Sequence, residues 1–205
     1  SGTAADIAAA LNGISGYIGT VEFTTDHSLS QLLAINNSTS GAITLNDASV
    51  VLSGSAADIT AALTGISGYT GAVAASGTQT GYTGVVAVNT LGAATSGVVT
   101  ATVSGASAEL AGLNTVGTDL IAVELSDAHT LGQLKAINNA TGGQITLNSV
   151  SVALSGTAAD IAAALDGSFA VSYTGAVSLK DVHDLPQLKA INAGTSGSIT
   201  LFSNT

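Results

Sequence analysis

An internal repeat of about 51 residues constrains this sequence more than any other feature. The segment Ser-Gly-Thr-Ala-Ala-Asp-Ile at 1–7 returns almost unchanged at 53–59 and 155–161, and a weaker copy lies at 104–110. The starts of these segments are separated by 52, 51 and 51 residues. Such self-similarity is typical of proteins in which stacked units bury a shared core. We therefore expect one continuous solenoid of four repeats, with bounds 1–52, 53–103, 104–154 and 155–205.

Each repeat is predicted to contain two helices, each followed by a short strand. The first helix begins with a hydroxyl residue and has an acid three residues later, as in Thr3 and Asp6, which is a variant of the capping box. The second helix uses Gln in the same place, as in Thr130 and Gln133. Segments in which apolar and polar residues alternate predict the strands. They lie at 20–23, 72–75, 122–125 and 176–179 in the first halves, and at 42–45 and 144–147 in two of the second halves.

These elements predict an α/β repeat solenoid similar to leucine-rich repeats. A strand that returns after a helical crossover pairs in parallel with the preceding strand. Each half-repeat of about 25 residues would then form one coil, so that a repeat contains two coils. A single coil of about 51 residues with two sheets is the alternative. The apolar pieces at 49–52 and 151–154 are either a third strand or an extended corner. In repeat 2 the second half is irregular, and Gly77–Gly84 is expected to be a loop.

The composition excludes several classes of partner. Thirteen acidic residues against three lysines give a net charge of −10, which disfavours nucleic acids and anionic membranes. The absence of cysteine excludes disulfides and thiolate metal sites. No apolar run is long enough for a transmembrane helix. Since the sequence begins at a repeat, without methionine or a signal peptide, we expect it to be a processed or excised piece of a longer chain.

Three histidines occupy one phase of the repeat, each with an acid nearby. A periodic pair of this kind has the chemistry to bind a metal or to move protons. The interpretation we favour is structural, with each histidine lying just before a helix N-cap and donating a hydrogen bond to the turn. The pairs are His27 with Asp26, His129 with Asp127, and His183 with Asp181.

The remaining carboxylates and hydroxyls predict no catalytic site. Asp6, Asp58, Glu109 and Asp160 fall at cap positions, and neither a nucleophile elbow nor a phosphate loop is present. The usual calcium-binding repeats are also missing. Calcium at the coil edges stays a hypothesis, and the candidate calcium ligands are Asp26, Asp47, Asp127 and Asp181. No other cofactor is expected.

A periodic threonine raises one further alternative, which is ice binding. Thr44, Thr100, Thr146 and Thr200 share one phase of the second strand and are expected to face outward. The outward residues beside them are irregular, and threonine favours exposed strand positions in any case. We therefore expect these threonines to be structural.

The chain resembles repeats of very large secreted and surface proteins of bacteria, especially cyanobacteria. The segments that carry the resemblance are Ser-Gly-Thr-Ala-Ala-Asp-Ile-Ala-Ala-Ala-Leu, Leu-Pro-Gln-Leu-Lys-Ala-Ile-Asn and Gly-Ser-Ile-Thr-Leu. It covers essentially the whole chain and is strongest in repeats 1, 3 and 4. The resemblance implies an extracellular, non-enzymatic role in a sheath, surface layer, adhesin or filament. Proteins similar to this one often carry calcium-binding repeats and a type I secretion signal elsewhere.

The leading hypothesis is a structural module of an extracellular bacterial assembly. The terminal coils of a solenoid expose apolar faces and unpaired strand edges, so we expect copies or flanking repeats to stack head to tail. The alternative is an adhesin arm that binds a glycan or a cell surface, with or without calcium. An enzyme ranks third. The one irregular segment that could hold a site, Gly77–Gly84, offers mainly Thr78, Gln79, Thr80 and Tyr82.

Overall fold

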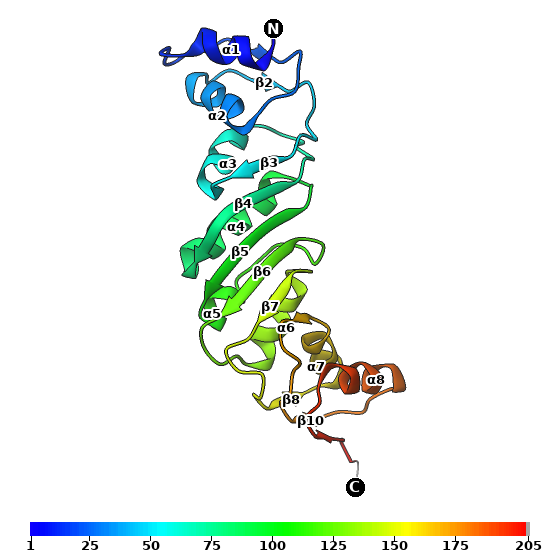
Figure 1. Cartoon of the computed structure of the whole chain (residues 1–205). Coiled ribbons are helices and arrows are strands. Elements are labelled where there is room, and N and C mark those ends of the chain that lie inside the picture. The colour runs from blue at the N-terminus through cyan, green and yellow to red at the C-terminus, as the bar shows by residue number, and fades with distance from the viewer. Residues whose placement is uncertain (204–205) are drawn as a thin grey trace. The chain divides into compact units, whose positions relative to one another are not determined.

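The computed structural model describes residues 1–203 and has an α/β fold with parallel sheets (Figure 1). This confirms the predicted class and the parallel pairing. Within that range there are eight helices, roughly one for each predicted half-repeat. They are α1 (Ala4–Leu11), α2 (Leu29–Ser38), α3 (Ala56–Leu63), α4 (Gly81–Ala94), α5 (Ser107–Leu110), α6 (Leu131–Asn139), α7 (Ala158–Leu165) and α8 (Leu185–Gly194).

The strands are short and follow the helices. The predicted strand positions correspond to β1, β2, β4, β6, β7 and β10, while the pieces that join repeats end in β3 and β8. The strands are β1 (Val21–Glu22), β2 (Ile43–Thr44), β3 (Leu52–Gly54), β4 (Val73–Thr80), β5 (Val99–Gly105), β6 (Leu120–Leu125), β7 (Gln144–Thr146), β8 (Leu154–Gly156), β9 (Ser168–Phe169), β10 (Val177–Leu179) and β11 (Ile199–Thr200).

The chain divides into two compact units. Unit 1 consists of Ser1–Gly77 with Ala87–Ala101, and unit 2 consists of Thr78–Val86 with the residues from Thr102 onward. In unit 1, β1 pairs with β2 and β3 pairs with β4, and α2 packs against both α1 and α3. In unit 2 the strands are ordered β6-β7-β9 and β8-β10-β11, and α7 packs against both α6 and α8. The largest sheet has the strand order β3-β4-β5-β6-β7-β9, and β4 and β5 contribute residues to both units.

The predicted helix caps are present. Thr3 Oγ1 accepts a hydrogen bond from the Asp6 amide at 3.1 Å, which satisfies one of the free N–H groups at the start of α1. In α6 the Thr130 hydroxyl and the Gln133 side chain form a complete capping box, and α2 and α8 have the same box. These local bonds explain why short helices form at the same phase of each repeat. Repeat 3 is the exception, since its first helix, α5, has only four residues and its N-cap residue, Ala106, has no side-chain group that could accept a hydrogen bond.

The strands alternate between the core and solvent as their sequences predict. In β1, Val21 is buried and Glu22 is exposed, and the neighbouring Phe23 is buried again. Ile145 in β7 is fully buried between exposed Gln144 and Thr146. The core therefore lies between the inner faces of the sheets and the helices.

The predicted loop Gly77–Gly84 is wrong. Its first four residues continue β4, and its last four form the first turn of α4. The helix begins at Gly81, which has a φ of +58°. The second half of repeat 2 thus contains a helix of 14 residues. Burial is the physical reason, because Val85, Val88 and Leu91 recur at intervals of three residues and all are buried.

Candidate functional site

The three histidines lie just before helix N-caps, as predicted. His27 precedes Ser28 of α2, and His129 precedes Thr130 of α6. The predicted hydrogen bond to the turn is wrong, however. Within residues 1–203, neither ring nitrogen of His27 has a hydrogen-bond partner, and the Nδ1 atoms of His129 and His183 also have none.

The surroundings of the two buried histidines are aromatic. The His27 ring lies between Phe23 and Tyr69, with ring centroids 5.7 and 6.4 Å away. His129 Nε2 lies 3.2 Å from the hydroxyl of Tyr173. Each imidazole packs against a tyrosine, His27 against Tyr69 and His129 against Tyr173. These contacts take the place of the predicted hydrogen bond to the turn.

Burial sets the charge of these groups. It lowers the pKa of His27 and of His129, since the protonated ring would lose its hydration, although nearby carboxylates oppose the shift. It also raises the pKa of Tyr69 and of Tyr173 to about 12. Both shifts favour the uncharged forms of His27, His129, Tyr69 and Tyr173, which suits side chains that pack against one another.

The four candidate calcium ligands each have another partner. Asp127 Oδ1 accepts from the Ser107 amide at 2.7 Å, and Asp181 Oδ1 from the Ala158 amide at 2.8 Å, so both hold the start of a helix. The Asp26 carboxylate accepts from the Asn46 side chain at 3.1 Å.

Asp47 stabilises its own turn. Its Oδ1 accepts from the Ser49 amide at 2.7 Å and from the Ser49 hydroxyl at 2.6 Å, and these bonds lower the pKa of the carboxyl. In the part of the chain that the structure describes, no three His, Asp or Glu side chains lie close enough together to hold a metal ion. The candidates are thus spread over separate turns rather than brought to one site.

Four buried threonines make the same hydrogen-bonded contact, which the sequence did not predict. Thr141 Oγ1 lies 2.7 Å from the Ile121 carbonyl in the preceding coil and accepts from the Gly143 amide at 2.8 Å. The same geometry recurs in both units. Its members are Thr39 with Gly19 and Gly41, Thr95 with Gly71 and Gly97, Thr141 with Ile121 and Gly143, and Thr195 with Gly175 and Gly197.

The signal for this contact is a Thr-x-Gly triplet after each second-half helix. The threonine hydroxyl crosses to a carbonyl in the previous coil, and the glycine has no side chain because that coil's backbone passes too close. A Cβ on Gly41 or on Gly143 would collide with a backbone carbonyl of the preceding coil. Each triplet therefore holds its own segment close to the backbone of a segment about 20 to 24 residues earlier.

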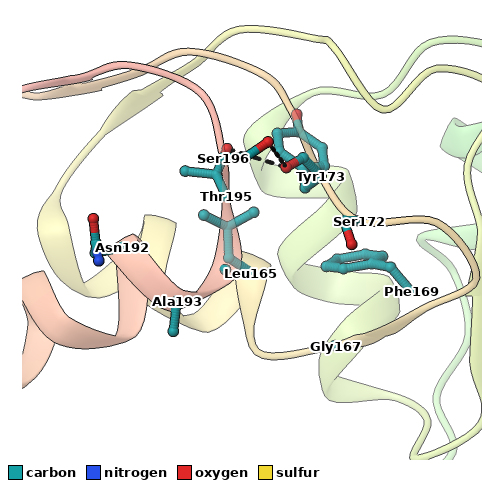
Figure 2. A pocket seen from close by; sticks show the side chains of 10 residues that line it. Leu165, Gly167, Phe169, Ser172, Tyr173, Asn192, Ala193, Thr195 and Ser196 are labelled. Carbon is teal, nitrogen blue, oxygen red and sulfur yellow. Dashed lines mark hydrogen bonds between the residues drawn. The ribbon is translucent and has the colours of Figure 1, made fainter.

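An open groove in unit 2 offers polar groups to solvent (Figure 2). It has a volume of about 520 Å³ and is lined by both polar and apolar residues from α7, α8 and the segments that follow them. The Ser196 and Thr195 hydroxyls bond to the Tyr173 carbonyl, and Phe169 lies beside Ser172. Tyr173 is the titratable side chain among the residues that line the groove, and burial raises its pKa to about 12.

None of the helices between residues 1 and 203 combines the length and apolarity needed to cross a membrane. Taken together, the fold and the site define an α/β protein with parallel sheets, in which the hydroxyls of four threonines bond to backbone carbonyls about 20 to 24 residues earlier in the chain. Comparisons with protein-family models, curated proteins and solved structures found no match to this chain.

Proposed function

We propose that this chain is a non-enzymatic structural module of an extracellular bacterial assembly, such as a filament, sheath or surface layer. In this proposal the fold is an α/β solenoid of four repeats with two coils each, and its copies stack end to end. Short helices and strands of this size cannot bury an apolar face alone, so stacking is their source of stability.

One observation carries the proposal, which is the recurrence of the same inter-coil contacts. The threonine contact appears twice in each unit, always after a second-half helix and always directed at the previous coil. Recurrent contacts of this kind serve to repeat a geometry rather than to build one unique site. The non-enzymatic part is supported by the carboxylates, which stabilise helix starts and turns.

Electron microscopy of the purified native material tests this proposal, together with immunogold labelling of intact cells. We expect label outside the cell envelope and elongated particles with an axial repeat of whole repeat units. Treatment with a calcium chelator is the companion measurement, since lost particles would add calcium at the coil edges. Label confined to the cell interior would contradict the proposal.

A second candidate, the adhesin arm, is favoured by the groove in Figure 2. Its Ser172, Asn192 and Ser196 side chains offer hydroxyl and amide groups of the kind that bind sugar hydroxyls. A glycan array with the wild-type chain tests this function. Binding that Asn192→Ala removes and Asn12→Ala retains would support it, since Asn12 is exposed and lies outside the groove.

A further inference from the structure

Two helix pairs inside the chain, α2 with α3 and α6 with α7, share most of their contacts. In unit 1 the side chain of Leu29 lies over Gly54, and in unit 2 Leu131 lies over Gly156. In both places a Cβ on the glycine would be 2.5 Å from the leucine Cδ2 atom. The leucine at the start of a second-half helix therefore packs into a space that the glycine of the next repeat leaves open.

The second shared contact is an asparagine amide. Asn36 Nδ2 in α2 donates to the Ala61 carbonyl near the end of α3 at 2.7 Å, and Asn138 Nδ2 in α6 donates to the Ala163 carbonyl near the end of α7 at 2.7 Å. The last carbonyls of a helix have no partner within it, so these amides satisfy groups that would otherwise need water.

Two more contacts complete the set. Lys135 in α6 forms an ion pair with Asp160 in the first turn of α7. We call each of these helix pairs, α2 with α3 and α6 with α7, a joint. At both joints a tyrosine after the second helix packs on the histidine before the first helix: Tyr69 lies against His27, and Tyr173 against His129.

Helix α8 presents one half of the same set to solvent. Leu185 is the counterpart of Leu131 and is 78% exposed. Lys189 and Asn192, the counterparts of Lys135 and Asn138, are also exposed. These three residues line an open groove of about 390 Å³ together with Leu188, Ile199 and Leu201.

Helix α1 presents the other half. Asp6 is the counterpart of Asp160 and is exposed, and the space over Gly2 holds no leucine. Ile7 is only half-buried, whereas its counterparts Ile59 and Ile161 are completely buried. Tyr17 is 41% exposed, whereas Tyr69 and Tyr173 are buried under a neighbouring coil.

We infer that a second copy of this chain docks its α1 on α8, head to tail, with the contacts of the internal joints. Leu185 packs over Gly2, Lys189 pairs with Asp6, and the Asn192 amide donates to the Ala9 carbonyl, the counterpart of Ala61 and Ala163. Tyr17 then covers His183, whose Nδ1 has no partner among the described residues. This inference rests on the end-to-end stacking of the proposed function, and it assigns that stacking to the exposed faces of α8 and α1.

A second copy fits this surface better than an unrelated partner, because it matches apolar shape, charge and hydrogen bonding together. The contact is heterologous, so each copy keeps one free face and the assembly grows without closing. The same faces are joined if another repeat follows in one chain, but the docking of separate copies is the event we predict.

A charge swap tests the joint. Sedimentation velocity should show that the wild-type chain associates as its concentration rises. Lys189→Asp places Asp opposite Asp6, and Asp6→Lys places Lys opposite Lys189, so each variant alone should associate about tenfold more weakly. An equimolar mixture of the two variants restores an opposite-charge pair at every contact and should recover association.

Lys180→Asp is the matched control, since Lys180 is exposed in the same unit and lies outside the groove. Leu185→Asp is an independent variant that should weaken association by more than about tenfold. Both positions are exposed, so far-UV circular dichroism should match the wild type. A chain that stays monomeric at all concentrations, equal weakening by Lys180→Asp, or no recovery in the mixture would overturn the joint. Immunogold labelling decides the extracellular role separately, so failure of one does not imply failure of the other.

Discussion

The joint between α2 and α3 in unit 1 and the joint between α6 and α7 in unit 2 share their uncharged contacts and differ in their charges. Both use a leucine over a glycine and an asparagine amide on a helix end. Only the second has an ion pair, between Lys135 and Asp160. In unit 1 the lysine is replaced by Leu33, and the Asp58 carboxylate accepts a bond from the Ser55 hydroxyl at 2.7 Å.

The comparison shows which contacts occur at both joints and which occur at only one. Contacts directed at the backbone are common to both joints, whereas the contact between two charged side chains is present in one. An exposed ion pair contributes little, because both charges lose hydration and side-chain freedom when they meet. We therefore expect backbone-directed contacts to dominate the stability of both units.

The largest effect is expected where glycine allows two coils to approach. Gly41→Ala in unit 1 and Gly143→Ala in unit 2 each place a methyl group against a carbonyl of the preceding coil, and should cost about 3 kcal/mol. Hydrogen exchange followed by mass spectrometry would report on each unit separately. Gly132→Ala is the control, because nothing lies within 4 Å of its Cβ position in α6. That change should be neutral or stabilising, and an equal loss there would refute a role for close approach.

The asparagines come next, and they should separate the two joints. Asn36 Nδ2 lies within hydrogen-bond distance of three carbonyls, at 2.7, 3.2 and 2.9 Å, whereas Asn138 Nδ2 has one carbonyl partner, at 2.7 Å. We expect Asn36→Ala to lower the free energy of unfolding by about 2 kcal/mol and Asn138→Ala by about 1 kcal/mol. Urea denaturation of the two variants gives this comparison. A larger loss for Asn138→Ala would show that the number of acceptors is irrelevant.

The histidines provide a smaller effect that depends on pH. Burial holds the folded-state pKa of His27 and of His129 below the ordinary value, so the unfolded chain binds protons more readily. Stability should therefore be fully present above pH of about 6.5 and decrease as the pH falls through the folded-state pKa values. Urea denaturation between pH 8 and pH 5 measures this slope. His27→Leu should remove the part that belongs to unit 1 and leave the part from His129, and an unchanged slope would contradict the assignment.

The smallest effect concerns the ion pair itself. Lys135→Ala should cost no more than about 0.5 kcal/mol, because both side chains of the pair are exposed. Leu33→Lys would bring the same pair to Asp58 in unit 1, with an expected gain of about 0.3 kcal/mol that disappears in 1 M salt. Thermal unfolding at low and high salt measures both changes. A cost of 2 kcal/mol or more for Lys135→Ala would show that charge matters more than we infer.

Local signals allowed the sequence to predict much of the fold. The N-cap residue (Ser28, Thr130 or Asp184) and the Gln of each capping box are three residues apart, so the starts of α2, α6 and α8 could be located from the chain alone. Strand alternation likewise predicted the buried faces of β1 and β7. Both kinds of signal lie within a few neighbouring residues.

The failures involve contacts between distant residues. Helix α4 has three glycines and a weak helix propensity, and only the burial of Val88 and its neighbours reveals it. The partner of His129 is Tyr173, 44 residues later, and the hydroxyl of Thr141 meets a carbonyl 20 residues earlier. The sequence placed the candidate calcium ligands in turns, but it could not show that Asp127 and Asp181 bond to the first amides of helices.

The asparagine contacts have a consequence for how such a chain changes over evolutionary time. Asn36 and Asn138 bond to main-chain oxygens, which every residue supplies, so mutations in the outward side chains of the next helix leave the bond intact. Gene duplication or recombination can then insert, delete or exchange whole repeats without a compensating substitution at each junction. The number of repeats can then change more easily than the glycines and asparagines at each junction.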